Sequence, residues 1–172
     1  YGPNNAVLVL AGDIDLATAK EKVTKWFGAI PSGDEVVDPA ISVPQLPADK
    51  EKVINDQVST TRIYRMWPIP GETSSDTVPL ALAQTTLGGL ASSRLDNALV
   101  RGQGLAVSVS SWAWTNEDAG VFIVQADLKP GVERATLEAA LDQQIAEFIA
   151  QGPTADELER SKTSIVSGLI GG

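Results

Sequence analysis

The side chains that most often perform catalysis or bind transition metals are missing from this sequence. Its 172 residues include no His and no Cys. Without imidazole the usual general base and the commonest zinc ligand are lost, and a Ser-His-Asp triad is excluded. Without thiols there can be no disulfide, no thiolate nucleophile and no Cys-based metal site. Chemistry by carboxylates alone, or by a Ser-Lys pair, stays formally open.

The candidates for those two remaining chemistries lie close together near the end of the sequence. Asp156, Glu157 and Glu159 fall in the first turn of a predicted helix, where acids interact favourably with the helix dipole. Three acids within one turn do not converge on one point, so no metal site is predicted there. Ser161 and Lys162 are adjacent, but no nucleophile motif surrounds them. We therefore expect no catalytic residue and no metal ligand in this sequence.

Net charge and hydropathy argue against a nucleic-acid-binding protein and against a membrane-spanning one. The formal net charge is -9 and the basic residues are scattered, which disfavours nucleic-acid binding because phosphate backbones are repelled. An acidic surface suits basic peptides, although solubility is the simpler explanation. No apolar run approaches the roughly 18 to 20 residues that a membrane span needs, so no span is predicted, and no signal peptide is recognised.

The first 50 residues indicate a short β-turn-α unit followed by a linker. The apolar run 6–11 predicts a strand buried on both faces. Asp13 or Asp15 is expected to cap a helix with apolar residues at helical spacing, which Gly28 ends. Four prolines between residues 29 and 50 are typical of a semi-extended linker. The predicted organisation is residues 1–30 as the closing β-α unit of a preceding domain, 31–50 as a Pro-rich linker and 51–172 as a second α+β domain truncated at its C-terminus.

The second domain is predicted to have the order β-α-α-β-β-α-α. One long strand or two short ones over 53–67 should end at Pro68 and Pro70. A helix capped by Ser74 or Ser75 should then break at Gly88-Gly89. Thr154 and Glu157 fit a capping box, in which each side chain bonds the backbone N–H of the other residue. The remaining expected elements are a short helix over 92–101, a hairpin of strands 106–114 and 120–128, a long helix carrying Leu137 to Ile149, and a last helix after Thr154. The fold class is α+β: a split β-α-β sandwich with an antiparallel-rich sheet and helices on one face.

Five stretches in order resemble the pitrilysin/insulinase-type zinc metallopeptidase family. Each stretch is weak alone, but together they cover nearly the whole chain. They are YGPNNAVLVLAGDID at 1–15, KWFGAIP at 25–31, LGGLASSRL at 87–95, GLAVSV at 104–109 and GPTADEL at 152–158.

The resemblance implies the region that follows the family's metal-binding domain. The second domain of the family repeats the fold of the first without its zinc ligands. The zinc-binding H-x-x-E-H helix, whose Glu is the general base, and a third ligand Glu would lie upstream. The implied partners are an upstream zinc-binding domain of the same chain or a catalytic partner subunit, and a peptide substrate. Zinc would be a cofactor of the parent protein and not of this segment.

Candidate substrate-contacting residues follow from the same resemblance, because the stretch near Gly88 faces the chamber between the family's two halves. The candidates are Gly88, Gly89, Ser92, Ser93, Arg94 and Arg101. Paired glycines let another chain approach closely, although a helix break for packing alone explains them as well. Arg94 either pairs with a local carboxylate or orients a peptide carbonyl. Arg101 matches an Arg that some relatives use with a Tyr, but Val107 stands at the Tyr position, which favours a solvated Arg at a helix end.

The sequence therefore predicts a non-catalytic structural and substrate-chamber segment of a bacterial zinc peptidase. Such a segment would supply a chamber wall, an inter-domain contact and backbone hydrogen bonds to an extended substrate by strand addition. The alternative is a scaffold or partner subunit of a wholly inactive paralogue. The resemblance favours the periplasm or cell envelope. Whether the parent is an active enzyme depends on an upstream H-x-x-E-H helix.

Overall fold

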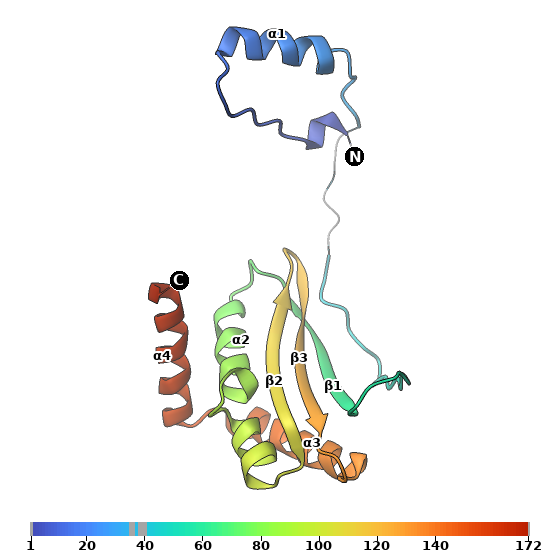
Figure 1. Ribbon diagram of the computed structural model, residues 1–172, viewed down its shortest axis with the longest axis vertical. Helices are drawn as coiled ribbons and strands as arrows, with labels where there is room; N and C mark the ends of the chain where they lie inside the picture. Colours follow the sequence, from blue (N-terminus) through green and yellow to red (C-terminus); the bar gives the residue numbers. More distant parts are fainter. Residues whose placement is uncertain (1, 35–36, 38–40, 172) are drawn as a thin grey trace. The chain divides into compact units, whose positions relative to one another are not determined.

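A computed structural model describes residues 2–34, 37 and 41–171 of the chain (Figure 1). The chain divides into two compact units, Tyr1–Ala40 and Ile41–Gly172, and each is described by itself. The predicted linker includes residues 35, 36 and 38–40, which lie outside the described residues. The predicted boundaries after residues 30 and 50 therefore stay predictions.

The first unit contains one long helix, which begins and ends where the sequence predicts. After the 3-10 turn η1 (Pro3–Asn5), helix α1 spans Leu16–Phe27. The Asp15 carboxylate accepts hydrogen bonds from the backbone N–H of Thr18 at 2.9 Å and from its hydroxyl at 2.7 Å. These bonds lower the pKa of Asp15 and satisfy an otherwise unpaired donor of the first turn. The Gly28 N–H bonds to the Thr24 carbonyl at 2.9 Å, which closes the helix.

The prediction of a buried strand over residues 6–11 is wrong. These residues are extended but belong to no sheet, and Val7 is 91% exposed. An apolar run becomes a strand only when a second strand supplies hydrogen bonds to its backbone. The described part of this unit contains no second strand, so the run stays unpaired. It borders a groove of about 370 Å³ lined by Leu8, Leu10, Leu16, Ala19, Lys20, Val23 and Thr24.

The second unit is an antiparallel sheet with helices packed against one face, which confirms the predicted α+β class. The three strands lie in the order β1-β3-β2, and both pairings are antiparallel. In Figure 1, α3 lies behind the sheet and the opposite face is toward the viewer. The elements in chain order are β1 (Arg62–Pro70), α2 (Thr77–Gln84), η2 (Thr85–Gly89), η3 (Asp96–Gly102), β2 (Ala106–Thr115), β3 (Ala119–Leu128), α3 (Arg134–Gln151) and α4 (Ala155–Gly171).

The first strand of this unit differs from its prediction at both ends. It begins at Arg62 and not near Val53, because residues 53–60 find no partner strand. It also continues through Pro68 and Pro70, which were expected to stop it. Proline cannot donate a ladder hydrogen bond, but an edge strand accepts it where the missing N–H would point away from the sheet. β1 is such an edge strand.

The hydrophobic core lies between the sheet and the helices. Leu95 and Leu99 lie at and within η3, Leu137 and Leu141 in α3, and Val124 in β3, and all five side chains are fully buried. Ile63, Ile69, Phe122 and Ala126 complete the sheet side of the same cluster. Burial of such side chains contributes about 1.5–3 kcal/mol each. This core holds η3, and therefore the predicted site, in a fixed position on the sheet.

The helical path that begins with α2 breaks at the paired glycines, as predicted. The helical path continues from α2 through η2, a π-helical turn, and ends at Gly89. A Cβ added to Gly88 would lie 2.7 Å from the Ser110 carbonyl carbon and from the Ser111 nitrogen. Gly88 therefore lets the helix touch the backbone of β2 directly, as the packing explanation of the glycines predicted.

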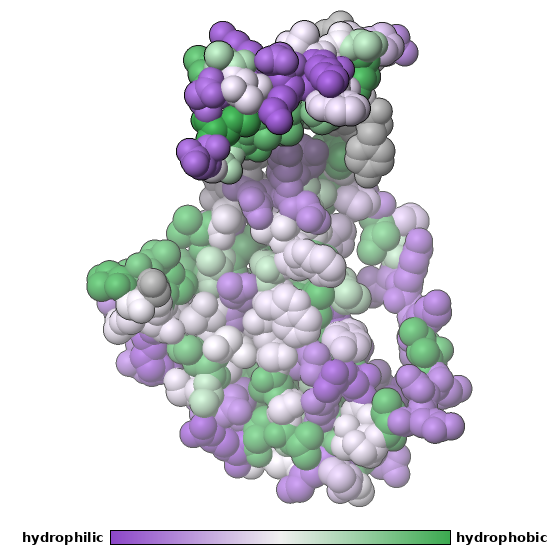
Figure 2. Space-filling model, turned by 45° about the horizontal axis from the view of Figure 1, so that its top comes forward, coloured by the Kyte–Doolittle hydropathy of each residue, from purple (hydrophilic) through white to green (hydrophobic). Residues whose placement is uncertain are grey.

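None of the described helices is both long enough and apolar enough to span a lipid bilayer. Apolar side chains are nevertheless exposed at the end of α4, where Val166, Leu169 and Ile170 form the green surface at the left of Figure 2.

Candidate functional site

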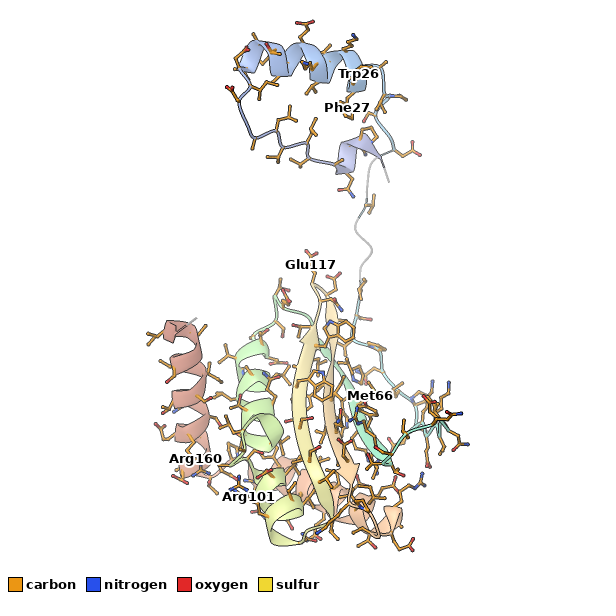
Figure 3. All side chains as sticks on the ribbon, in the orientation of Figure 1. Trp26, Phe27, Met66, Arg101, Glu117 and Arg160 are labelled. Carbon is orange, nitrogen blue, oxygen red and sulfur yellow. The ribbon has the colours of Figure 1, made fainter. Side chains whose placement is uncertain are left out.

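All six candidate residues lie in one segment, from the end of η2 to the end of η3. The structure separates them into two groups. Gly88, Ser93 and Arg94 are buried or half-buried in contacts within the protein, whereas Gly89, Ser92 and Arg101 are exposed. Only the second group is available to another molecule. Arg101 is labelled on the surface of η3 in Figure 3.

Arg94 pairs with a local carboxylate, one of its two predicted roles. Its Nε lies 2.9 Å from Glu157 Oε1 and its Nη2 lies 2.5 Å from Glu157 Oε2. Nη2 also donates to the Gly152 carbonyl at 3.1 Å, and the guanidinium lies 5.1 Å from the centre of the Phe148 ring. Such a bidentate, stacked arrangement is specific to arginine. Arg94 thus fastens the start of α4 and the end of α3 to the segment before η3.

Glu157 takes part both in the ion pair with Arg94 and in the N-terminal cap of α4. Its Oε2 accepts the backbone N–H of Thr154 at 2.8 Å, and the Thr154 hydroxyl accepts the Glu157 N–H at 3.2 Å, which confirms the capping box. Hydrogen bonding by Arg94, followed by the backbone bond from Thr154, lowers the pKa of Glu157 to about 2, although burial opposes the shift. The sequence showed the cap but not the partner, because Arg94 precedes Glu157 by 63 positions.

A small polar cavity lies where η2 meets α4. It has a volume of about 10 Å³ and is lined by Thr85, Thr86, Leu90, Ser92, Ser93, Glu157, Arg160 and Ser161. The hydroxyls of Thr86 and Ser161 hydrogen-bond each other at 2.9 Å. Ser93 Oγ is buried and has no hydrogen-bond partner among the residues that the structure describes. The space matches one water molecule and not a peptide side chain, so Ser93 is placed for packing.

Replacing the two buried serines is expected to have unequal consequences. Ser93→Ala should change the free energy of unfolding by less than about 0.5 kcal/mol, because no hydrogen bond to another group of the described residues is lost. Ser161→Ala should cost about 1–2 kcal/mol, because it leaves the buried Thr86 hydroxyl without its partner. Urea denaturation of both variants measures the difference. Equal costs would contradict the assignment of hydrogen bonds in this cavity.

Arg101 is exposed but already has partners. Its Nε lies 2.7 Å from Asp96 Oδ2, and its Nη2 donates to the Ala91 carbonyl. The guanidinium therefore bridges η3 to the connection that carries Ser92. The Arg101 side chain is 60% exposed and the Asp96 side chain 19%, so the guanidinium is accessible to solvent although its carboxylate partner is mostly covered.

The residues present do not fit a zinc site. The sequence offers no imidazole and no thiolate. In the part of the chain that the structure describes, Asp and Glu side chains nowhere gather in a group of three that could hold a metal ion. A hard oxygen-only site is thus not built here, and no chemical step of this chain is assigned to a metal.

The sequence pattern of a known domain, the "peptidase M16 inactive domain", matches residues 1–165. The chain belongs to this family. It is 26% identical over 172 residues to an uncharacterized zinc protease of Bacillus subtilis, covering 99% of this chain and 40% of that protein. A zinc protease of Mycobacterium leprae, also uncharacterized, is 26% identical with 99% and 38% covered. The chain therefore spans about two fifths of the curated relatives that it matches.

Solved structures show the same fold for this M16 inactive domain. A peptidase M16 inactive domain from Pseudomonas fluorescens has a TM-score of 0.67 at 22% identity, over 90% of this chain and 37% of that chain. A protease from Helicobacter pylori has a TM-score of 0.66 at 23% identity, over 93% of this chain and 40% of that chain. The predicted family and fold are confirmed. None of these similarities tests the six candidate residues, whose contact with substrate stays a prediction.

Proposed function

We propose that this inactive domain forms one wall of the substrate chamber of a zinc peptidase whose metal is bound by another domain. The match to the M16 inactive domain over residues 1–165 carries this proposal. The absence of His and Cys from this chain supports the proposal that another domain binds the zinc, because His and Cys are the commonest zinc ligands. In this arrangement the domain binds and orients peptide, and zinc held by the catalytic domain would supply Lewis-acid polarisation of the peptide carbonyl and activation of water.

The first unit supports the presence of a neighbouring domain. Its extended run 6–11 has strand geometry without a partner strand, and it exposes apolar side chains on both faces. A chain of this kind is stable when it joins a sheet, which supplies hydrogen bonds to its backbone and covers its side chains. We assign this unit to the sheet of the upstream domain, as the residue 1–30 boundary predicts.

Purification of the full-length parent tests the assignment. Zinc content and peptide cleavage are measured on the parent and on this 172-residue chain under the same conditions. The expected result is zinc-dependent cleavage by the parent and neither property in the chain alone. A parent without zinc and without activity would favour the scaffold function instead, and zinc-dependent cleavage by the chain alone would contradict both proposals.

Arg101 provides the most direct test of substrate contact. Arg101→Ala in the parent is expected to lower kcat/KM for peptide cleavage about tenfold, the effect of losing roughly 1.4 kcal/mol of binding in the transition state. The free energy of unfolding should fall by at most about 1 kcal/mol, because Arg101 is 60% exposed, although Asp96 is only 19% exposed. Arg134→Ala is the matched control, since Arg134 is also a partly exposed arginine and forms ion pairs with Glu51 and Glu138. Equal activity of the two variants would remove Arg101 from the site.

A further inference from the structure

One buried side chain of the sheet lies outside the hydrophobic core. Ile123 of β3 is only 5% exposed, yet the core cluster contains its neighbours Phe122 and Val124 and does not contain Ile123. Successive side chains of a strand point to opposite faces of the sheet, so Ile123 lies on the face opposite the core. The helices that cover the core therefore do not cover Ile123. This second face, the open face, carries the side chains of Tyr64, Met66, Trp112, Trp114, Val121 and Ile123.

The strand register identifies the side chains that shield Ile123. Met66 of β1 stands directly opposite Ile123 on one side, and Trp112 of β2 stands directly opposite it on the other. Opposed side chains of an antiparallel pair have Cβ atoms about 4.5–5.5 Å apart and contact each other. Ile123 is thus covered by its cross-strand neighbours, and Met66 supplies the cover on the side of β1.

Met66 also carries the one sulfur atom of the chain. The sequence contains a single Met and no Cys, so no thiol competes with the thioether for an oxidant. Met66 is 56% exposed, and Figure 3 labels it on β1, which is an edge strand. Susceptibility to oxidation increases with exposure of the sulfur-bearing side chain. The residue that covers Ile123 is therefore also the residue that an oxidant reaches.

We propose that Met66 is a site of reversible oxidation that uncovers Ile123 and makes the open face polar. A lone pair of the sulfur attacks one oxygen of hydrogen peroxide; the S–O bond forms as the O–O bond breaks, and the other oxygen leaves as water after proton transfer. The sulfur is oxidised and the peroxide is reduced. Methionine sulfoxide reductases return the sulfoxide to the thioether. The sulfoxide oxygen requires hydrogen bonds from water, so the side chain turns away from the apolar surface of Ile123.

The position of Met66 confines this change to the open face. Ile63, which belongs to the core cluster, lies at an odd position of β1, and Met66 lies at an even one. The Thr61 carbonyl accepts from the Leu128 N–H at 2.9 Å, and the register is regular along the whole of β1. The odd residues of β1 therefore bond to β3, and the even residues direct their backbone groups away from it. Oxidation of Met66 breaks neither the ladder nor the core.

Methyl NMR on this chain tests the proposal, because Met66 gives the one methionine methyl signal. The chain is labelled with carbon-13 at the methionine and isoleucine methyl groups, and the signal of Ile123 is assigned with Ile123→Val. In hydrogen peroxide, the Met66 signal should move to the sulfoxide position at a rate within about threefold of that of N-acetylmethioninamide. The relaxation of the Ile123 methyl group by a soluble gadolinium chelate should then increase at least about twofold, because this methyl group loses its apolar cover.

Two substitutions separate the sulfur from the shape of the side chain. Met66→Leu keeps an apolar cover without sulfur, so peroxide should leave the relaxation of Ile123 unchanged. Met66→Gln places a polar group at the same site, so the relaxation of Ile123 should be high without peroxide. Treatment of the oxidised chain with methionine sulfoxide reductases should restore both original signals.

Four outcomes would overturn the proposal. Met66 might stay reduced while N-acetylmethioninamide is fully oxidised, or Ile123 might stay protected after Met66 is fully oxidised. The same change of Ile123 in Met66→Leu would place the effect at another residue. Loss of the dispersed signals of all isoleucines would indicate unfolding and not a change of one face. The measurement involves neither zinc nor cleavage, so it stands apart from the zinc-peptidase proposal, whichever way that is decided.

Discussion

Glu157→Ala is expected to lower the free energy of unfolding by about 3 kcal/mol, within the range for breaking a largely buried ion pair. The side chains of Arg94 and Glu157 are 14% and 15% exposed, so the unpaired guanidinium would stay buried without its carboxylate. The same substitution also removes half of the capping box with Thr154. Equilibrium denaturation in urea measures the loss.

Asp156→Ala is the matched control for this substitution. Asp156 is the preceding acid in the first turn of α4, and it pairs with Arg160 at the surface with 80% of its side chain exposed. Its loss should cost less than about 1 kcal/mol. If both substitutions cost the same, the effect comes from acids near the helix N-terminus in general, and the Arg94 pair carries no special stability.

The same pair predicts how stability depends on pH. The Arg94 guanidinium holds the pKa of Glu157 at about 2, below its ordinary value of 4.5. A carboxyl whose pKa is lower in the folded state stabilises the fold above pH 4.5. This contribution falls as the pH drops from 4.5 toward 2, where Glu157 becomes protonated in the folded state also. Glu157→Gln should therefore unfold with a shallower dependence on pH in this window, which acid denaturation of both proteins measures.

The sequence predicted the elements whose causes are local. The Asp15 cap, the end of α1 at Gly28 and the Thr154–Glu157 capping box depend on residues within four positions of each other, and the structure confirms each. The hairpin of β2 and β3 belongs to the same class, because its two strands adjoin in sequence. The order of elements from β1 onward, and hence the fold class, followed from these local patterns.

The errors arose where the cause is distant in sequence. Residues 6–11 and 53–60 have strand composition, but a strand exists only when another segment pairs with it, and composition does not reveal the partner. The continuation of β1 through Pro68 depended on its place at the sheet edge, which the sequence does not show. The direction of the even-numbered backbone groups of β1 became visible only with the register.

For the candidate site, too, the local features were predictable and the long-range contacts were not. Its location in one segment was predictable, since all six residues lie between positions 88 and 101. The role of Arg94 was not, because Glu157, Gly152 and Phe148 are 54 to 63 positions away and many other acids were available. The motif that carried the family resemblance thus contains a structural arginine beside the exposed residues Gly89 and Ser92, whose contact with substrate stays a prediction.

Gly88→Ala is expected to destabilise the domain by about 2–3 kcal/mol, because the added methyl group cannot be accommodated by a side-chain rotation. Its nearest neighbours would be backbone atoms of Ser110 and Ser111 at 2.7 Å, so η2 and β2 would have to separate. Gly168→Ala is the control: no atom lies within 4 Å of its added Cβ, and α4 should gain up to about 1 kcal/mol from the better helix former. Thermal denaturation of both variants shows whether the first is less stable and the second more stable than the native protein.

The consequence of Gly88→Ala also extends to the outer edge of β2. Separation of η2 from β2 would weaken the hydrogen bonds by which Gln84 covers Ala113 and Ser111, and would expose the backbone groups of this edge. Hydrogen exchange at Ala113 should then accelerate in this variant while Tyr64 of β1 stays unchanged. If the variant is as stable as the native protein and Ala113 keeps its protection, the glycine is not required for helix–strand contact. Its place in the motif would then have to come from contact with another molecule.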